Sequence, residues 1–184
     1  VRQVQRMKAD LMHHFNPGTD EEAIKYVASV YKDRVAALGL PRGEVVLVET
    51  AEDETGILAD LVYDGRRDAV LGSCGKSGDG HKCDFSHMTV LGSDGAGGVG
   101  SVAAKVDSEC DDYVRAGHAR LVILNPLHDQ LPRMVISFSP TCNKFTAADV
   151  GAQWDDLQPL LKKHLEPIGM EVVGCASDGD ARRF

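Results

Sequence analysis

The run Glu44–Thr50 (EVVLVET) constrains the possible folds more than any other segment of this chain. It is continuously apolar and rich in β-branched residues, which is typical of a buried strand. A second run of this kind, Met170–Ala176 (MEVVGCA), lies near the end of the sequence. Because buried strands need other elements packed on their faces, these two runs predict an α/β fold.

Two amphipathic helices accompany these strands. The first is predicted from Thr19, which forms a capping box with Glu22, to Gly39, where the helical spacing of apolar residues ends. The second starts at Thr146 and carries Pro159, which predicts a kink or a fresh helix start. Other elements are a helix at 101–115 and strands at 57–64, 69–72, 119–127 and 134–139, the last two forming a hairpin or one bent strand. The order predicts a mixed sheet with covering helices.

The sequence divides into an N-terminal helical segment, residues 1–40, and a core, residues 41–184. Within the core, residues 73–100 are rich in glycine and lack periodicity, so we expect an insertion that forms a long loop. The chain opens with apolar residues on one helical face, as if a helix had been cut, and ends at Phe184 soon after the last strand. We therefore expect a core that is incomplete at its C-terminus.

Composition limits the functions and the cellular locations that are expected for this chain. The chain has 184 residues and a net charge of −8, so nucleic-acid binding by overall charge is excluded and would need a local basic patch or bridging cations. No apolar run approaches the roughly 18 residues that span a bilayer, and no signal peptide is visible. The five cysteines are an odd number, which favours reduced thiols in a nuclear or cytoplasmic protein.

Acidic residues follow both apolar strands. Glu52, Asp53 and Glu54 come after the first, and the motif Ser177-Asp178-Gly179-Asp180 follows the last. If these strands are parallel neighbours, their carboxylates converge at one edge of the sheet, where ligands of open α/β sheets bind. Converging carboxylates need a divalent cation or a proton between them. The simpler explanation is that acidic residues are common in loops after strands.

The order of these motifs resembles the RNase H-like catalytic core of cut-and-paste transposases of the P-element type and of transposon-derived relatives. In that family a strand ends in an Asp-Glu pair, a second strand carries Tyr-Asp, and a helix leads to a strand ending in a Ser-Asp-Gly motif followed by Arg. The matching residues here are Asp53-Glu54, Tyr63-Asp64, and Ser177-Asp178-Gly179 with Arg182 and Arg183. The resemblance covers roughly residues 44–72 and 119–184.

The resemblance implies a DDE/D-type transposase core that cleaves and transfers DNA strands with Mg²⁺ or Mn²⁺. Asp53 and Asp178 would be the first two metal-binding catalytic carboxylates, and the family's third acidic residue would lie beyond Phe184. DNA is the implied partner, and a homo-oligomer is compatible with it. The alternative is an inactive, domesticated relative that serves as a DNA- or protein-interaction module. A third hypothesis is another phosphotransfer domain, acting on small phosphoesters.

Four residues of zinc-ligand type, Cys74, His81, Cys83 and His87, lie within the Gly-rich insertion. Their spacing differs from the paired Cys-x₂-Cys units of zinc fingers, so we expect no zinc cofactor and regard them as loop residues. The segment Gly92–Gly100 lacks the Lys-Ser/Thr of a phosphate-binding loop, which favours a flexible linker.

Overall fold

The computed structural model describes residues 16–57, 59, 61–64, 68–78, 81–85, 89–90 and 112–177. The chain forms two compact units. Unit 1 comprises Val1–Asp53, Leu121–Phe138 and Thr146–Phe184, and unit 2 comprises Glu54–Arg120 and Ser139–Phe145. The segments predicted at residues 1–15 and 101–111, and the carboxylate of Asp178, lie outside the described residues.

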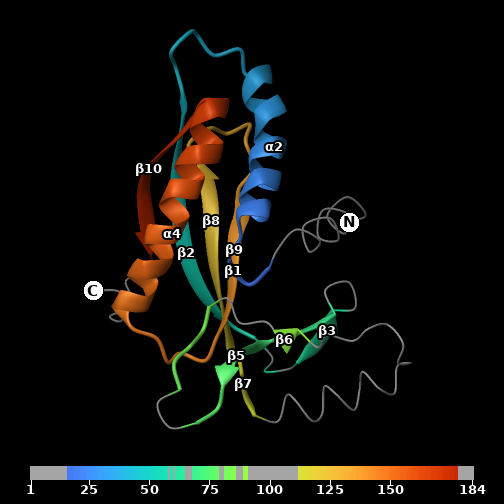
Figure 1. Ribbon diagram of the computed structural model, residues 1–184. Coiled ribbons are helices and arrows are strands. Elements are labelled where there is room, and N and C mark those ends of the chain that lie inside the picture. Colours follow the sequence, from blue (N-terminus) through green and yellow to red (C-terminus); the bar gives the residue numbers. More distant parts are fainter. Residues whose placement is uncertain are drawn as a thin grey trace. The chain divides into compact units, whose positions relative to one another are not determined.

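A five-stranded sheet is the main element of the fold (Figure 1). Its order is β1-β9-β8-β2-β10. The strands are β1 (Gly18–Thr19), β2 (Val46–Gly56), β8 (His118–Pro126), β9 (Met134–Thr141) and β10 (Met170–Ser177). β10 pairs with β2 in parallel, whereas β1 pairs with β9 antiparallel. The expected mixed sheet is therefore present, and β8 and β9 are two neighbouring strands, not one bent strand.

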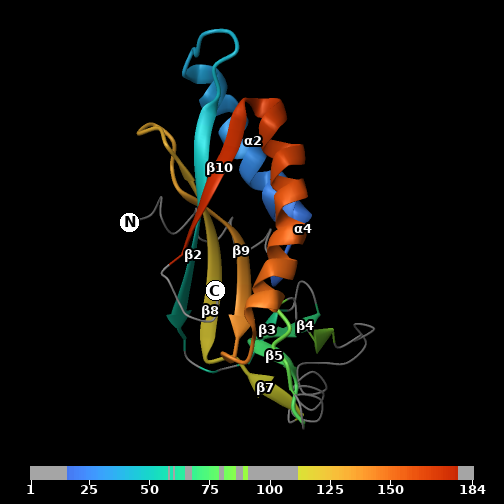
Figure 2. The ribbon, with the colours of Figure 1, turned by 90° about the vertical axis from the view of Figure 1, so that its left-hand side faces the viewer.

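Two helices, α2 (Glu21–Ala37) and α4 (Ala147–Leu165), lie side by side and pack on the sheet (Figures 1 and 2). Their apolar stripes form the core of unit 1 with alternate residues of the strands, among them Tyr31, Val48 and Leu161. A 3₁₀ turn, η1 (Glu166–Ile168), connects α4 to β10. None of the described helices is long and apolar enough to cross a membrane.

Local details of the helices differ from the sequence pattern. Asp20, not Thr19, caps α2, because its side chain accepts a hydrogen bond from the Glu22 backbone N–H at 2.9 Å. α4 begins after Thr146 as predicted, and Thr146 and Asp149 form a reciprocal capping box there. α4 also runs without interruption through Pro159, so the fresh helix start that was one expectation for this proline is not present.

The two apolar strands are less buried than their sequences indicated. Buried and exposed residues alternate along the first half of β2, and Leu47 is 42% exposed. β10 is an edge strand of the described sheet, and most of its residues are exposed. The helices therefore bury one face of these strands, and the continuous apolar runs do not signal burial on both faces.

Unit 2 contains short strands. β3 (Val62–Asp64), β4 (Ala69–Leu71) and β6 (Thr89–Val90) form a three-stranded sheet, in which β3 and β4 pair antiparallel as the predicted hairpin. β5 (Ser73–Lys76) pairs with β7 (Tyr113–Arg115). The insertion was expected to be a long loop, but β5 and β6 lie within it. Residues 113–115, expected to be helical, form a strand. The Tyr63-Asp64 strand joins this smaller sheet and not the five-stranded one.

Candidate functional site

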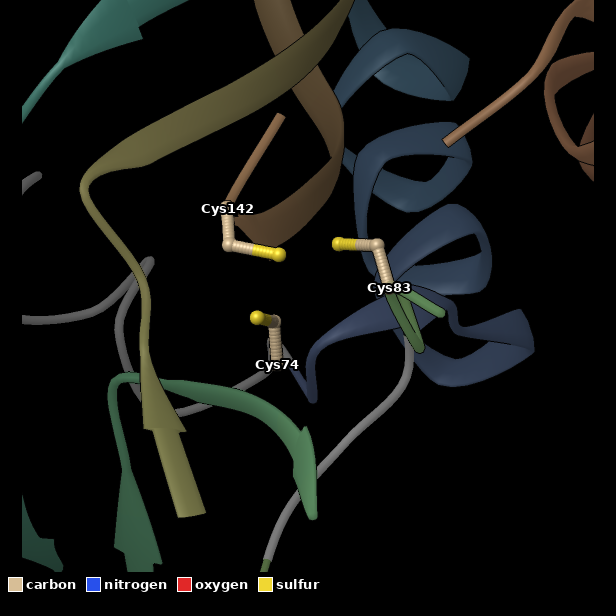
Figure 3. Close-up of side chains that lie close together, drawn as sticks. All are labelled: Cys74, Cys83 and Cys142. Carbon is tan, nitrogen blue, oxygen red and sulfur yellow. The ribbon is translucent and has the colours of Figure 1, made fainter. Parts of the chain in front are cut away.

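Three cysteines meet in unit 2. Cys74 lies on β5, Cys83 lies in the segment 81–85, and Cys142 follows β9 directly. Their side chains point toward one another (Figure 3), and the three Sγ atoms all lie within 4.8 Å of one another. Cys74 is fully buried, and the other two are partly buried. A set of thiols this close, shielded from solvent, has the composition of a metal-binding site.

Backbone contacts hold the three segments together. The Asp84 N–H donates to the Cys74 carbonyl at 2.8 Å, and the Cys83 N–H donates to the Lys144 carbonyl at 3.1 Å. Gly75 lies next to Cys74 with a φ of +123°, in the left-handed region that favours glycine, and a Cβ there would lie 3.3 Å from His81 Cε1. These contacts, and the absence of a side chain at Gly75, allow the loop to approach β5.

His81 lies beside two of these thiols, Cys74 and Cys142. Its Nε2 atom is 3.2 Å from Cys142 Sγ and 3.6 Å from Cys74 Sγ. Its other ring nitrogen, Nδ1, is 2.7 Å from the carbonyl oxygen of Lys76. Because that carbonyl can only accept, Nδ1 must carry the proton, which leaves the lone pair of Nε2 facing the sulfurs in the neutral ring.

The thiols are electrostatically unequal. The hydrogen bond with Cys74 lowers the pKa of Cys83 to about 7. The same interaction, together with burial, raises the pKa of Cys74 above its ordinary range. The first proton is therefore lost from Cys83, and its thiolate accepts a hydrogen bond from the Cys74 thiol. Thiolates, not thiols, are the form that binds metal ions and acts as a nucleophile.

The expectation that zinc is absent from this protein is wrong. It rested on the spacing of Cys74, His81 and Cys83, and it omitted Cys142, which lies 61 positions after His81. The cluster of Cys74, Cys83 and Cys142 could hold a metal ion such as zinc. The ligands come from separate segments, so no short spacing rule could identify the set. His87, the fourth residue considered, lies outside the described residues.

The sequence analysis placed the acidic residues Glu52, Asp53 and Glu54 after the first apolar strand. In the structure they lie within β2, which continues to Gly56. Their side chains consequently alternate in direction. Asp53 is exposed, whereas Glu52 is only 5% exposed and accepts a hydrogen bond from Trp154 Nε1 at 3.2 Å. Glu54 accepts one from Thr141 Oγ1 at 2.7 Å. Asp178 lies outside the described residues, so the convergence of Asp53 with Asp178 stays a prediction.

A cavity of about 220 Å³ lies beside Glu52 in unit 1. It is lined by residues of β2, β10 and the first turns of α4, including Trp154, Gly151 and Ser177. The parallel register places Ser177, the last residue of β10, opposite Glu52, which lies inside β2 before its end at Gly56. Asp178 follows Ser177 in the sequence.

A scan against protein-family models, a search of curated proteins and a search of solved structures each found no match to this chain.

Proposed function

We propose that unit 1 is an RNase H-like core of the cut-and-paste transposase type, whose function is metal-dependent cleavage and transfer of DNA strands. The supporting observation is the parallel pairing of β2 with β10, with Ser177 opposite Glu52. The resemblance requires that the strand carrying the first acid and the strand leading to Ser-Asp-Gly be parallel neighbours.

The helix between these strands also supports the proposal. α4 leads from β9 to η1 and β10, and its first turns line the cavity beside Glu52. Ligands of α/β sheets bind at the carboxyl ends of parallel strands, where helices begin and strands end. The cavity lies at the carboxyl end of β10 and at the start of α4, and it is lined by Glu52, a carboxylate that is nearly excluded from water.

The geometry also bears on which carboxylate of β2 would act. The resemblance assigns the first metal-binding role to Asp53 and the second to Asp178. Glu52 is the acid that faces the cavity, whereas Asp53 is exposed. Divalent cations of this kind are held by carboxylate oxygens together with water and phosphate oxygens. Glu52 is therefore a competing candidate for the role of Asp53, and substitution separates the two.

Trp154 provides a direct test, because it is the only tryptophan and its Nε1 contacts the Glu52 carboxylate. Titration of the zinc-loaded chain with Mn²⁺, a paramagnetic quencher, should quench Trp154 fluorescence with saturation. Asp178→Asn should abolish the quenching. Of Asp53→Asn and Glu52→Gln, the variant that removes the residue binding the ion should also abolish it. Glu49→Gln, which removes a charge from the same strand outside the cavity lining, is the matched control. A parent chain that shows no saturable quenching would overturn the metal-dependent mechanism.

Activity is tested with supercoiled DNA on the same substitutions in a protein extended past Phe184, so that the third acidic residue implied by the resemblance is included. Nicking that requires the divalent cation and is lost in Asp178→Asn would support strand cleavage. DNA binding without nicking would favour the alternative of an inactive, domesticated interaction module. Hydrolysis of a small phosphoester without any action on DNA would instead favour another phosphotransfer domain. Each outcome therefore distinguishes one of the three hypotheses.

A further inference from the structure

We propose that His81 completes a four-ligand zinc site with Cys74, Cys83 and Cys142, and that the bound ion maintains the fold of unit 2 without taking part in catalysis. All four residues belong to unit 2. The site is independent of the cavity beside Glu52, so this inference stands or falls separately from the activity proposed for unit 1.

The distances agree with tetrahedral zinc. With Zn–S bonds near 2.3 Å and Zn–N bonds near 2.0 Å, neighbouring ligand atoms of a tetrahedral site lie roughly 3.5–3.8 Å apart. His81 Nε2 lies 3.6 Å from Cys74 Sγ and 3.2 Å from Cys142 Sγ. The three sulfurs are all within 4.8 Å of one another. His81 Nε2 thus already lies near the ligand spacing from Cys74 and Cys142, and closing the site requires His81 Nε2 and Cys83 Sγ to move toward each other.

The orientation of His81 is that of a metal ligand. A zinc-bound histidine donates its second ring N–H to a carbonyl or carboxylate, which fixes the ring and its tautomer. His81 Nδ1 has this partner in the Lys76 carbonyl at 2.7 Å. Its Nε2 therefore presents a lone pair to at least two sulfurs at once. A single thiol hydrogen bond would satisfy that lone pair, but it would not explain why three sulfurs lie this close together.

The ligand set indicates a structural role. Catalytic zinc sites have three protein ligands and leave the fourth position to water or substrate, whereas structural sites are closed by four protein ligands. Three cysteines and one histidine fill all four positions. Three thiolates would also give the zinc complex a net charge of −1. Within two positions of a ligand lie three exposed cations, Lys76, Lys82 and Lys144, and one exposed carboxylate that opposes them, Asp84.

Unit 2 has the composition of a unit that needs such a site. Its buried apolar residues within the described part of the chain are small or few: Ala69, Val70, Cys74, Ala116, Ala119 and Phe145. Its described strands have two to four residues, apart from the ends of β2, β8 and β9. Small domains that cannot bury enough apolar surface commonly depend on metals or disulfides. A zinc ion would connect β5, the loop at 81–83 and the segment after β9.

Metal analysis and cobalt substitution test the site. The purified chain should contain one zinc per molecule, and replacement by Co²⁺ should give the intense bands of tetrahedral cobalt with thiolate-to-cobalt charge transfer. Cys142→Ser should lose the stoichiometric zinc. Cys175→Ser, which removes an exposed cysteine of unit 1, is the matched control and should retain it. A chain without bound zinc that also fails to bind added Co²⁺ would overturn the proposal.

A further variant isolates His81 and remains informative if Cys142→Ser fails to fold. His81→Ala should weaken zinc binding and shift the cobalt spectrum, whereas His81→Cys should restore a tetrahedral site with four thiolates. Restoration by cysteine cannot result from a packing role of the imidazole alone. If His81→Ala leaves the cobalt spectrum of the parent chain unchanged, His81 is not a ligand and the closed site is wrong.

Discussion

The two units of this chain are stabilised in different ways. Unit 1 has a continuous apolar core, in which α2 and α4 contribute side chains at helical spacing and the strands contribute alternate residues. The described part of unit 2 has short strands, few large buried apolar side chains and a cluster of thiols beside His81. The comparison teaches that an apolar core can be recognised from local periodicity, whereas a thiol cluster depends on single residues far apart in the sequence.

The largest expected effect is the loss of unit 2 on metal removal. Structural zinc sites contribute on the order of 10 kcal/mol of apparent binding free energy, and that energy is part of the folding free energy. A strong chelator should therefore remove amide-exchange protection from β4, β5 and β7, whereas α2, α4 and β10 keep theirs. Hydrogen exchange read by mass spectrometry separates these segments, and added zinc should restore the protection. Equal loss in both units would contradict the distinction between them.

Leu161→Ala should instead destabilise unit 1 and leave unit 2 unaffected. Leu161 is 1% exposed in the core of unit 1, so its truncation leaves a cavity and should lower the free energy of unfolding by about 2–5 kcal/mol. The zinc content should remain unchanged, because the site lies in the other unit. Denaturant unfolding followed by Trp154 fluorescence measures the loss. Leu127→Ala, at a side chain that is 52% exposed, is the control and should change stability by less than about 0.5 kcal/mol.

The sequence predicted the fold best where the physical signal is local. The apolar stripe of α4, its start at Thr146 and the hairpin of β3 and β4 each depend on residues within one or two turns or strands. The β2 run was identified as a strand, but its end was placed too early, because acidic residues are unusual inside strands. The strand can contain the buried carboxylate of Glu52 because Trp154 donates a hydrogen bond to it. This contact joins residues 102 positions apart, so the local sequence does not reveal it.

The thiol cluster could not be predicted in the same way. Cys74, His81 and Cys83 were visible as residues of ligand type, but the third thiol, Cys142, enters the cluster only through tertiary structure. The sequence 73–85 lacks periodicity, and its described contacts include backbone hydrogen bonds of Cys74, Cys83 and Asp84 and the close approach of Gly75 to His81. The available sign that Cys142 belongs to a ligand set was its place just after a strand, and no other cysteine or histidine lies near it in the sequence.

A smaller effect in unit 1 is expected from the capping box of α4. Thr146 Oγ1 accepts a hydrogen bond from the Asp149 N–H, and the Asp149 side chain accepts from the Thr146 N–H at 2.7 Å. Thr146→Ala removes the first of these and should cost about 1 kcal/mol of stability. Thr146→Ser keeps the hydroxyl and should lose much less. If both variants unfold at the same denaturant concentration as the parent chain, the cap does not contribute to unit 1.

The smallest effect is expected at the surface contact between α2 and α4, and its pH dependence separates it from metal loss. Glu21 Oε1 lies 2.8 Å from Lys163 Nζ and 2.9 Å from His164 Nε2, and these hydrogen bonds lower the pKa of Glu21 to about 2 from its ordinary value of 4.5. A carboxylate with a lowered pKa stabilises the fold at pH values above 4.5, and the contribution disappears as the pH falls toward 2.

The difference in melting temperature between the parent chain and Glu21→Gln should therefore be positive at neutral pH, and it should vanish at the acid end of that range. Salt should reduce it, because the pair is exposed. Protonation of the cysteine and histidine ligands would release zinc from both proteins alike and cancel in this difference. A gap that persists at pH 2 would show that Glu21 acts through packing and not through its charge.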